Sequence, residues 1–288
     1  MNPQTTNIRT RDGHFLSLSL YLPPGGTPWQ VLVVGPGAGV EQARYRPFAE
    51  YCAERGCAVL TFDYRGIGYS GNDRMKDFQA TLRQWANQDL DAVLRHAHNA
   101  FPKQEIVFVG HCISGEIAGI APAGEYIHRM VLVSSALSCW RLWPHRSQFL
   151  ILLMKLLTPL IVWRYGFFPG KRLRYLNDMP RGVILELSNW CNRPNGLFDV
   201  FPDNNYRKMK IPLLAYSFTD DWFSPPKAVA ALLGHFSNAQ PRWQHLDPVE
   251  IGLKKVGHDG FFDPACATLW EQMLAWCGNL PLNDPMTQ

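Results

Sequence analysis

The stretch from Val107 to Gly115 limits the folds open to this chain more than any other segment. It begins with Val107-Phe108-Val109, an apolar run typical of a buried β-strand, and continues as Gly110-His111-Cys112-Ile113-Ser114-Gly115. Glycine and other small residues after such a run allow a sharp change of direction, and the residues beyond Gly115 can begin a helix. The sequence therefore predicts a strand that turns abruptly into a helix, with Cys112 in the turn.

Similar apolar runs recur along the chain and alternate with amphipathic segments. Strands are expected at residues 15–21, 30–34, 57–62, 130–133, 211–217 and 243–246. Helices are expected at residues 46–55, 78–97, 226–233 and 268–276. This alternation predicts an α/β fold with a mostly parallel, doubly wound sheet.

The interval between the strands at 130–133 and 211–217 spans nearly eighty residues, too many for one crossover helix. We expect a helical cap at residues 137–208, inserted into an α/β core formed by residues 1–136 and 209–288. Within it, Phe149–Trp163 is the most apolar stretch of the chain. Its fifteen residues, interrupted by Lys155 and Pro159, are fewer than the ~20 that cross a membrane. A lid helix lining an acyl pocket is expected, with a purely structural packing helix as the alternative.

Composition and charge exclude several classes of function. The net charge of +4, without a Lys/Arg-rich run, does not indicate a nucleic-acid-binding protein. Residues 1–14 lack the apolar core of a signal peptide, which predicts a cytoplasmic protein. The seven cysteines form no C-x-x-C pair, so we expect reduced thiols and neither disulfides nor a metal site. The sequence does not determine the oligomeric state.

The turn at Cys112 resembles the nucleophile elbow of the α/β-hydrolases, a strained turn whose usual motif is Gly-x-Ser-x-Gly. The fold class that this resemblance implies is the α/β-hydrolase fold with an inserted helical cap. Two positions depart from the motif. Cys112 stands where the nucleophilic serine usually lies, and Ser114 replaces the second glycine.

In α/β-hydrolases the nucleophile is followed along the chain by an acid and then a histidine, each on a loop after a strand. Asp220 and Asp221 follow the strand that ends at Ser217, and His258 lies in a Gly-His loop after the last expected strand. We favour Asp221, because Asp221-Trp222-Phe223-Ser224-Pro225 looks like the D-x-x-x-P segment that carries the acid in many such enzymes. Asp220 remains open as the alternative.

An oxyanion hole requires two backbone amides directed at the reacting carbonyl oxygen. Ile113, directly after Cys112, is expected to provide one of them. The second is expected from the glycine-rich loop after the strand at 30–34, where Pro36 has no N–H to donate. Gly37 is the first choice and Ala38 the second. The loop lacks the Gly-x-Gly-x-x-Gly and Gly-Lys-Ser/Thr spacings of nucleotide-binding loops, and no cofactor is expected.

Several segments together resemble a family of largely uncharacterised bacterial α/β-hydrolases, over nearly the whole chain. The elbow of that family is Gly-His-Ser-Leu-Gly-Gly, so the chain differs from it at Cys112 and two residues further on. Cysteine nucleophiles at this position are known elsewhere in the superfamily, in dienelactone hydrolases and polyhydroxyalkanoate synthases. The segments that carry the resemblance are Tyr45–Ala49, Leu60–Gly68, Val109–His111, Trp140–Pro144, Ser217–Asp221, Gly257-His258 and Gly260-Phe261-Phe262.

A cysteine in the elbow points to acyl transfer through a thioester intermediate. A neighbouring imidazolium and a helix N-terminus favour the reactive thiolate, and thioesters pass their acyl group to water, thiols, amines or alcohols. We therefore expect Cys112, His258 and Asp221 to act as a triad on an ester or thioester, by hydrolysis or by transfer or cyclisation. The alternatives are Cys112 as a small apolar residue of an inactive site, and a non-catalytic ligand-binding or scaffold protein.

Three further residues are candidates for the substrate pocket, namely Ser114, Trp140 and Trp222. For Ser114, simple tolerance of a small side chain in place of glycine is the alternative to a polar contact with substrate.

The expected cap is basic, with Asp178 as the one acidic residue between 141 and 181 against eight Lys or Arg residues. This charge suits an anionic partner such as the phosphates of coenzyme A, an acyl carrier protein or an acidic membrane surface. A solvated basic face without a partner is the alternative. The basic residues are Arg141, Arg146, Lys155, Arg164, Lys171, Arg172, Arg174 and Arg181.

Overall fold

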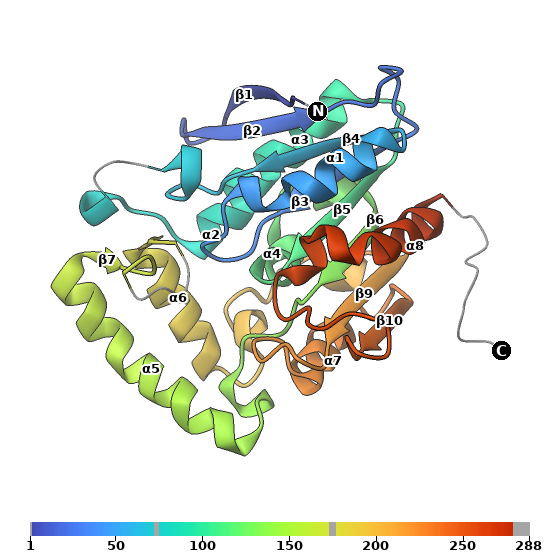
Figure 1. Ribbon diagram of the computed structural model, residues 1–288. Helices are drawn as coiled ribbons and strands as arrows, with labels where there is room; N and C mark the ends of the chain where they lie inside the picture. The colour runs from blue at the N-terminus through green and yellow to red at the C-terminus, as the bar shows by residue number, and fades with distance from the viewer. Residues whose placement is uncertain (1, 72–74, 173–176, 279–288) are drawn as a thin grey trace.

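The computed structural model describes residues 2–71, 75–172 and 177–278 (Figure 1). Within them, an eight-stranded sheet has the order β1-β2-β4-β3-β5-β6-β9-β10. Its strands are β1 (Gln4–Arg9), β2 (Phe15–Tyr21), β3 (Gln30–Gly35), β4 (Cys57–Phe62), β5 (Ile106–His111), β6 (Ile127–Val133), β9 (Leu213–Phe218) and β10 (Pro241–Leu246).

The strands from β4 to β10 run parallel, as the sequence predicts, and β1 and β2 are antiparallel additions at one edge. The central strands β3, β4 and β5 are buried along their whole length, as a sheet covered on both faces requires. β3 and β5 are direct neighbours in the sheet, with Gly35 opposite Gly110. The glycine-rich loop after β3 therefore begins beside the turn at Cys112.

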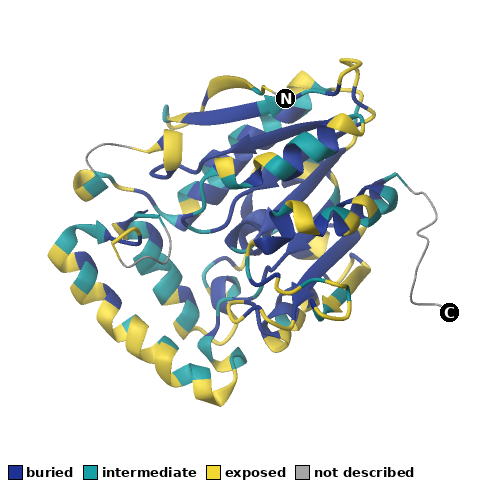
Figure 2. Cartoon of the chain, viewed as in Figure 1, coloured by how far each residue is buried: buried dark blue, intermediate teal, exposed yellow. Residues whose placement is uncertain are grey.

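Helices cover both faces of the sheet (Figures 1 and 2). One apolar core includes residues of α1 and α8, and the other includes residues of α3, α7 and the inserted segment. The helices are α1 (Arg46–Glu54), α2 (Leu82–Gln84), α3 (Asp91–Ala100), α4 (Ile113–Ile117), α5 (His145–Tyr165), α6 (Arg181–Asn192), α7 (Pro226–Gly234) and α8 (Ala267–Cys277).

Strand β1 has no counterpart in the prediction, because its residues are polar and show no buried alternation. Ile8 is its one buried residue, and the strand is held by antiparallel pairing with β2. Edge strands of this kind are stabilised by backbone hydrogen bonds that the side-chain pattern does not reveal.

The helix expected from residue 78 begins later, at Leu82, where Thr81 and Gln84 form a capping box. Between α2 and α3 the chain makes a wide π-helical turn at Trp85–Leu90. This turn carries Asp89, which is fully buried and lies 2.7 Å from the Arg65 guanidinium. Arg65 also pairs with Asp12 at 2.6 Å, so the loop after β4 is held by a buried ion-pair network.

Between β6 and β9 the chain forms α5, the short pair β7 (Phe167–Phe168) and β8 (Met179–Pro180), and α6. Helix α5 has 21 residues and continues through Pro159, so it is longer than the fifteen residues expected. It ends at Gly166, whose φ of 82° is a left-handed cap that favours glycine. The inserted segment reaches the loop after β3, where Asn177 donates to the carbonyl oxygen of Gly39. That residues 137–208 form a separate domain stays a prediction.

We expect Asp89→Ala to lower the free energy of unfolding by about 3 kcal/mol, because it leaves the buried Arg65 guanidinium without one of its two partners. Glu50→Ala is the control, since its pair with Arg46 lies at the surface and its loss should change stability by less than about 1 kcal/mol. Denaturant unfolding followed by circular dichroism measures both. Equal losses in the two variants would contradict the importance of the buried network.

Candidate active site

Cys112 occupies a strained turn between β5 and α4. Its φ of 52° and ψ of −118° are unusual for a residue with a side chain, and its amide donates to the carbonyl oxygen of Val133 at 3.0 Å. Glycines make the turn sterically possible. A Cβ atom on Gly110 would lie 2.9 Å from the amide nitrogen of Gly115, and one on Gly115 would overlap Ser135. This is the geometry of a nucleophile elbow, with the Cys112 side chain half-buried.

The structure brings Asp221 to His258. The Nδ1 atom of His258 lies 2.9 Å from Oδ2 of Asp221, which is buried and also accepts hydrogen bonds from the Ser224 hydroxyl and the Phe223 amide. Asp220 instead accepts from the amides of Val256 and Gly257, both at 2.9 Å. Asp221 is therefore the partner of the imidazole, and Asp220 positions the loop that carries it.

The charges of Cys112, His258 and Asp221 stabilise one another. Burial opposes a positive charge on His258, but the negative charge of Cys112 and the hydrogen bond to Asp221 outweigh it and raise the pKa of His258 to about 10. Burial likewise opposes the charge of Asp221, but the interactions with His258 and Ser224 hold its pKa below the ordinary value. With Nδ1 facing Asp221, Nε2 is the ring nitrogen left for Cys112.

The amide of Gly37 is not available for an oxyanion hole, which corrects the expectation from the sequence. It donates to the hydroxyl of Tyr45 at 2.8 Å, in a buried position. The amides of Ala38 and Ile113 make no hydrogen bond to any residue that the structure describes. Ala38 lies in the loop that begins beside the elbow, so Ala38, the second choice from the sequence, stays the candidate partner of Ile113 in an oxyanion hole.

A buried chain of hydrogen bonds connects the oxyanion loop with the histidine loop. His111 Nε2 lies 3.0 Å from the carbonyl oxygen of His258, which can only accept, so Nε2 carries the proton. The Tyr45 hydroxyl therefore donates to His111 Nδ1, at 2.7 Å, and accepts from Gly37. Burial first, and the charge on His258 second, lower the pKa of His111 to about 3, so this histidine is neutral.

Ser114 does not line a substrate pocket, although the sequence made it a candidate for one. Its side chain is fully buried, and its hydroxyl donates to the carbonyl oxygen of Pro36 at 2.5 Å. Since that proton is used, the hydroxyl of Tyr64 donates to Ser114 at 2.8 Å. Ser114 therefore connects the elbow to Pro36, in the loop after β3, and to Tyr64, in the loop after β4.

Of the two tryptophans, Trp222 lines a cavity beside His258, and the role of Trp140 in a substrate pocket stays a prediction. An open cavity of about 650 Å³ is lined by residues that include Asp221, Trp222, Phe223 and His258, and neither Cys112 nor Trp140 is among its lining residues. Trp140 instead lies against the Arg141 guanidinium, 4.8 Å from its ring centre.

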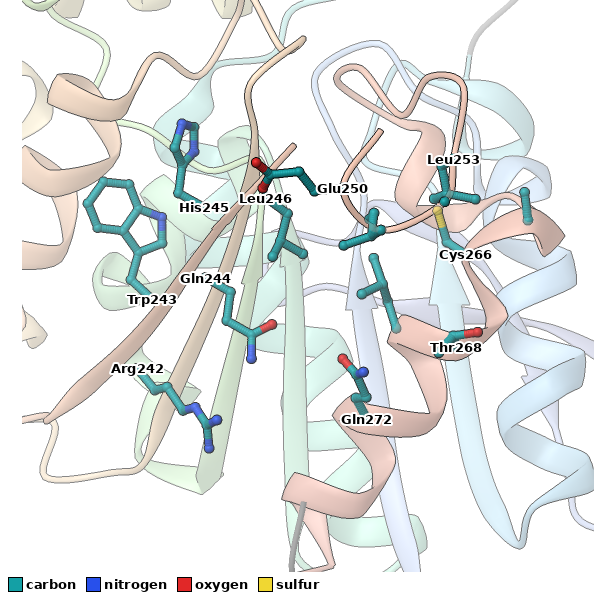
Figure 3. A pocket seen from close by; sticks show the side chains of 14 residues that line it. Arg242, Trp243, Gln244, His245, Leu246, Glu250, Leu253, Cys266, Thr268 and Gln272 are labelled. Atoms are coloured by element: carbon teal, nitrogen blue, oxygen red, sulfur yellow. The ribbon is translucent and has the colours of Figure 1, made fainter. Parts of the chain in front are cut away.

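A larger cavity, of about 860 Å³, lies between β10 and α8 (Figure 3). Its lining includes Trp243, Gln244 and Gln272, and none of Cys112, Asp221 and His258. Size alone is thus a poor guide to the site in this molecule. In the part of the chain that the structure describes, no group of three or more His, Cys, Asp or Glu residues could hold a metal ion.

Sequence reasoning missed the residues that support the site. Tyr45 holds the oxyanion loop, Ser224 holds Asp221, and Arg44 donates to the carbonyl oxygen of Asp259 at 2.8 Å, next to His258. Tyr45 was part of a segment that carries the family resemblance, but only the fold reveals what its hydroxyl contacts.

The fold and the elbow define this protein as an α/β-hydrolase. The chain belongs to the serine aminopeptidase S33 family, whose sequence pattern matches residues 26–180. It is 31% identical to a monoglyceride lipase from Rattus norvegicus over 127 residues, which cover 43% of this chain and 40% of the relative. It is 26% identical to the esterase FrsA of Photorhabdus laumondii over 202 residues, 68% of this chain and 42% of that protein.

The matches thus span about two fifths of the length of these curated relatives. Among solved structures, a soluble variant of the monoglyceride lipase of Saccharomyces cerevisiae has a TM-score of 0.71 at 14% identity, covering 97% of this chain and 96% of that one. At this identity the likeness concerns the fold.

Tyr45→Phe should destabilise the protein by about 1–3 kcal/mol, because the amide of Gly37 loses its partner inside the core. Tyr216→Phe is a matched control, since the Tyr216 hydroxyl is buried without a hydrogen-bond partner among the described residues. Its removal should be neutral or stabilising. Thermal and denaturant unfolding of both variants test this, and a Tyr45→Phe variant as stable as the wild type would contradict it.

Cys112→Ala should lower the pKa of His258 from about 10 towards the ordinary value of about 6.5, because it removes the strongest influence that favours the charged ring. A raised folded-state pKa also means that charged His258 stabilises the fold below about pH 6.5 and that this contribution disappears as the pH approaches 10. NMR titration of the histidine ring protons measures the shift. Cys139→Ala, which removes another buried cysteine, should leave the titration of His258 unchanged.

Proposed function

We propose that the protein is an acyl-transfer enzyme in which Cys112 attacks the carbonyl carbon of an ester or thioester. The observation that carries the proposal is the arrangement of Cys112 in a positive-φ turn, coupled electrostatically to a His258 that is held 2.9 Å from Asp221. A buried structural cysteine would have no need of an imidazole paired with a buried carboxylate.

The reaction proceeds in two steps. The Cys112 thiolate forms a bond to the carbonyl carbon, and the negative charge that develops on the carbonyl oxygen is stabilised by the amides of Ile113 and Ala38. His258 then gives its proton to the leaving alcohol or thiol, and a thioester to Cys112 remains. Water or another nucleophile gives a proton back to His258 as it attacks the thioester, and Cys112 leaves as a thiolate.

The relatives favour a carboxylic ester as the substrate, since a monoglyceride lipase and an esterase are among them. The cysteine keeps thioesters among the donors to test, including acyl groups on coenzyme A or an acyl carrier protein, for which the exposed Arg141, Arg146 and Arg164 provide positive charge. Hydrolysis and transfer differ only in which nucleophile takes the acyl group in the second step.

Incubation with p-nitrophenyl esters, a monoacylglycerol and acyl-coenzyme A should give a covalent acyl adduct, detected by intact mass. We expect the adduct in the wild type and in Cys139→Ala, and a loss of turnover of about a thousandfold or more in Cys112→Ala. Cys112→Ser reports whether the elbow also operates with a hydroxyl.

Turnover that persists in Cys112→Ala would overturn the proposal. A wild type that neither turns over any donor nor alkylates faster at Cys112 than at its other cysteines would favour a non-catalytic binding protein instead.

A further inference from the structure

Helix α5 exposes an unusual amount of apolar surface. Among the described residues, sixteen large apolar side chains are exposed, and nine of them lie on this one helix. Figure 2 shows exposed residues along its length, on the outer side of the inserted segment. The nine are Phe149, Leu150, Leu152, Leu153, Met154, Leu156, Leu157, Leu160 and Trp163.

Such a helix is expected to be covered. The apolar residues of α5 surround the helix and do not form a single stripe, a pattern found in helices buried in a protein core or in lipid. Only Thr158 and Val162 of α5 are buried against the rest of the protein. An apolar patch this concentrated marks an interaction surface rather than the scattered exposure of an ordinary monomer.

By length and composition α5 could cross a membrane. Both of its ends, however, are attached to the hydrolase core. Ser147 at its start accepts a hydrogen bond from the Trp222 indole at 3.0 Å, and Lys171 beyond its end pairs with Glu41 at 3.7 Å. The chain then returns to β9 of the same sheet. This attachment on one side favours a helix that lies in a membrane surface over one that spans the bilayer.

The charges around α5 identify the surface it fits. From residue 141 to residue 172 the sequence contains no Asp or Glu. Arg146 is exposed in the first turn of α5, and Arg164 and Arg172 are exposed at and beyond its end. Lys155, the one charged residue in between, is half-buried. Positive charge at both ends of an apolar stretch whose one internal charge is half-buried complements anionic head groups around an acyl-chain region.

A second copy of the chain fits this surface less well. Two α5 helices packed together would bring basic ends near one another in either orientation, without acidic residues of that segment to pair with them. The charge therefore favours lipid over self-association.

We propose that α5 docks onto an anionic lipid surface, with its apolar side chains among the acyl chains and its terminal arginines at the head groups. Trp222, next to the acid Asp221, contacts the start of α5, and its carbonyl oxygen accepts from the Trp143 indole at 3.1 Å. Docking thus places the mouth of the site at the membrane. Resting on the proposed function, this implies an ester or thioester substrate drawn from the lipid phase.

Co-sedimentation of the full chain with vesicles tests the docking. The vesicles are phosphatidylcholine alone and phosphatidylcholine mixed with phosphatidylglycerol. We expect the wild type to bind the mixed vesicles more tightly, and Arg146→Gln/Arg164→Gln/Arg172→Gln or added salt to remove that preference.

Leu156→Gln/Leu160→Gln/Trp163→Gln should reduce binding to the mixed vesicles at least about tenfold. Phe15→Gln/Tyr69→Gln/Val249→Gln is the matched control, because it removes three side chains of similar exposure that lie elsewhere on the surface. This control should bind like the wild type.

Several results would overturn the proposal. They are no vesicle binding by the wild type, unchanged binding of the α5 variant, or equal binding to both vesicle compositions. A dimer in light scattering that the α5 substitutions dissociate, without vesicle binding, would assign the surface to a second copy. Cys112→Ala should bind vesicles like the wild type, and turnover of a soluble ester is measured separately, so failure of the docking and failure of the proposed chemistry are distinguishable.

Discussion

The close approach of β5, α4 and the chain after β6 is the contact on which the candidate site depends. Gly110 and Gly115 lie so near one another, and Gly115 so near Ser135, that no larger residue fits at either glycine. This packing allows the turn at Cys112, whose backbone conformation costs of order 1–3 kcal/mol in a residue with a side chain. The turn places Cys112 at its tip, and the Ile113 amide at the start of α4 makes no hydrogen bond to any residue that the structure describes.

The rest of the site is held in register with this turn by neutral hydrogen bonds inside the core. His111, the residue before Cys112, contacts the histidine loop through one ring nitrogen and Tyr45 through the other. Because burial keeps His111 uncharged, it does not compete with His258 for the proton that catalysis would use. Asp220 adds an anchor for the same loop. Positioning and proton transfer are therefore assigned to different groups.

The fold could be predicted where side-chain patterns reflect burial. The central strands are continuous apolar runs, and the long interval before Ile211 indicated an insertion. β1 was missed because its pairing with β2 is a backbone interaction between polar residues. The length of α5 was underestimated because the helix extends beyond the apolar stretch 149–163 into the mostly polar residues 145–148 and 164–165. Apolar sequence also gave no sign that this helix is exposed, since the same composition suits a packed core.

The sequence by itself determined the class of fold, the turn at Cys112 and the loops that carry Asp221 and His258, because these follow from local patterns and from their order along the chain. Only the tertiary structure decided which neighbours the ambiguous residues have. The amide of Gly37 donates to the hydroxyl of Tyr45, whereas the amide of Ala38 makes no hydrogen bond to a described residue. The hydroxyl of Ser114 accepts from Tyr64 and donates to Pro36. These contacts join residues far apart in sequence, so the pattern around each residue holds no information about the partner that satisfies it.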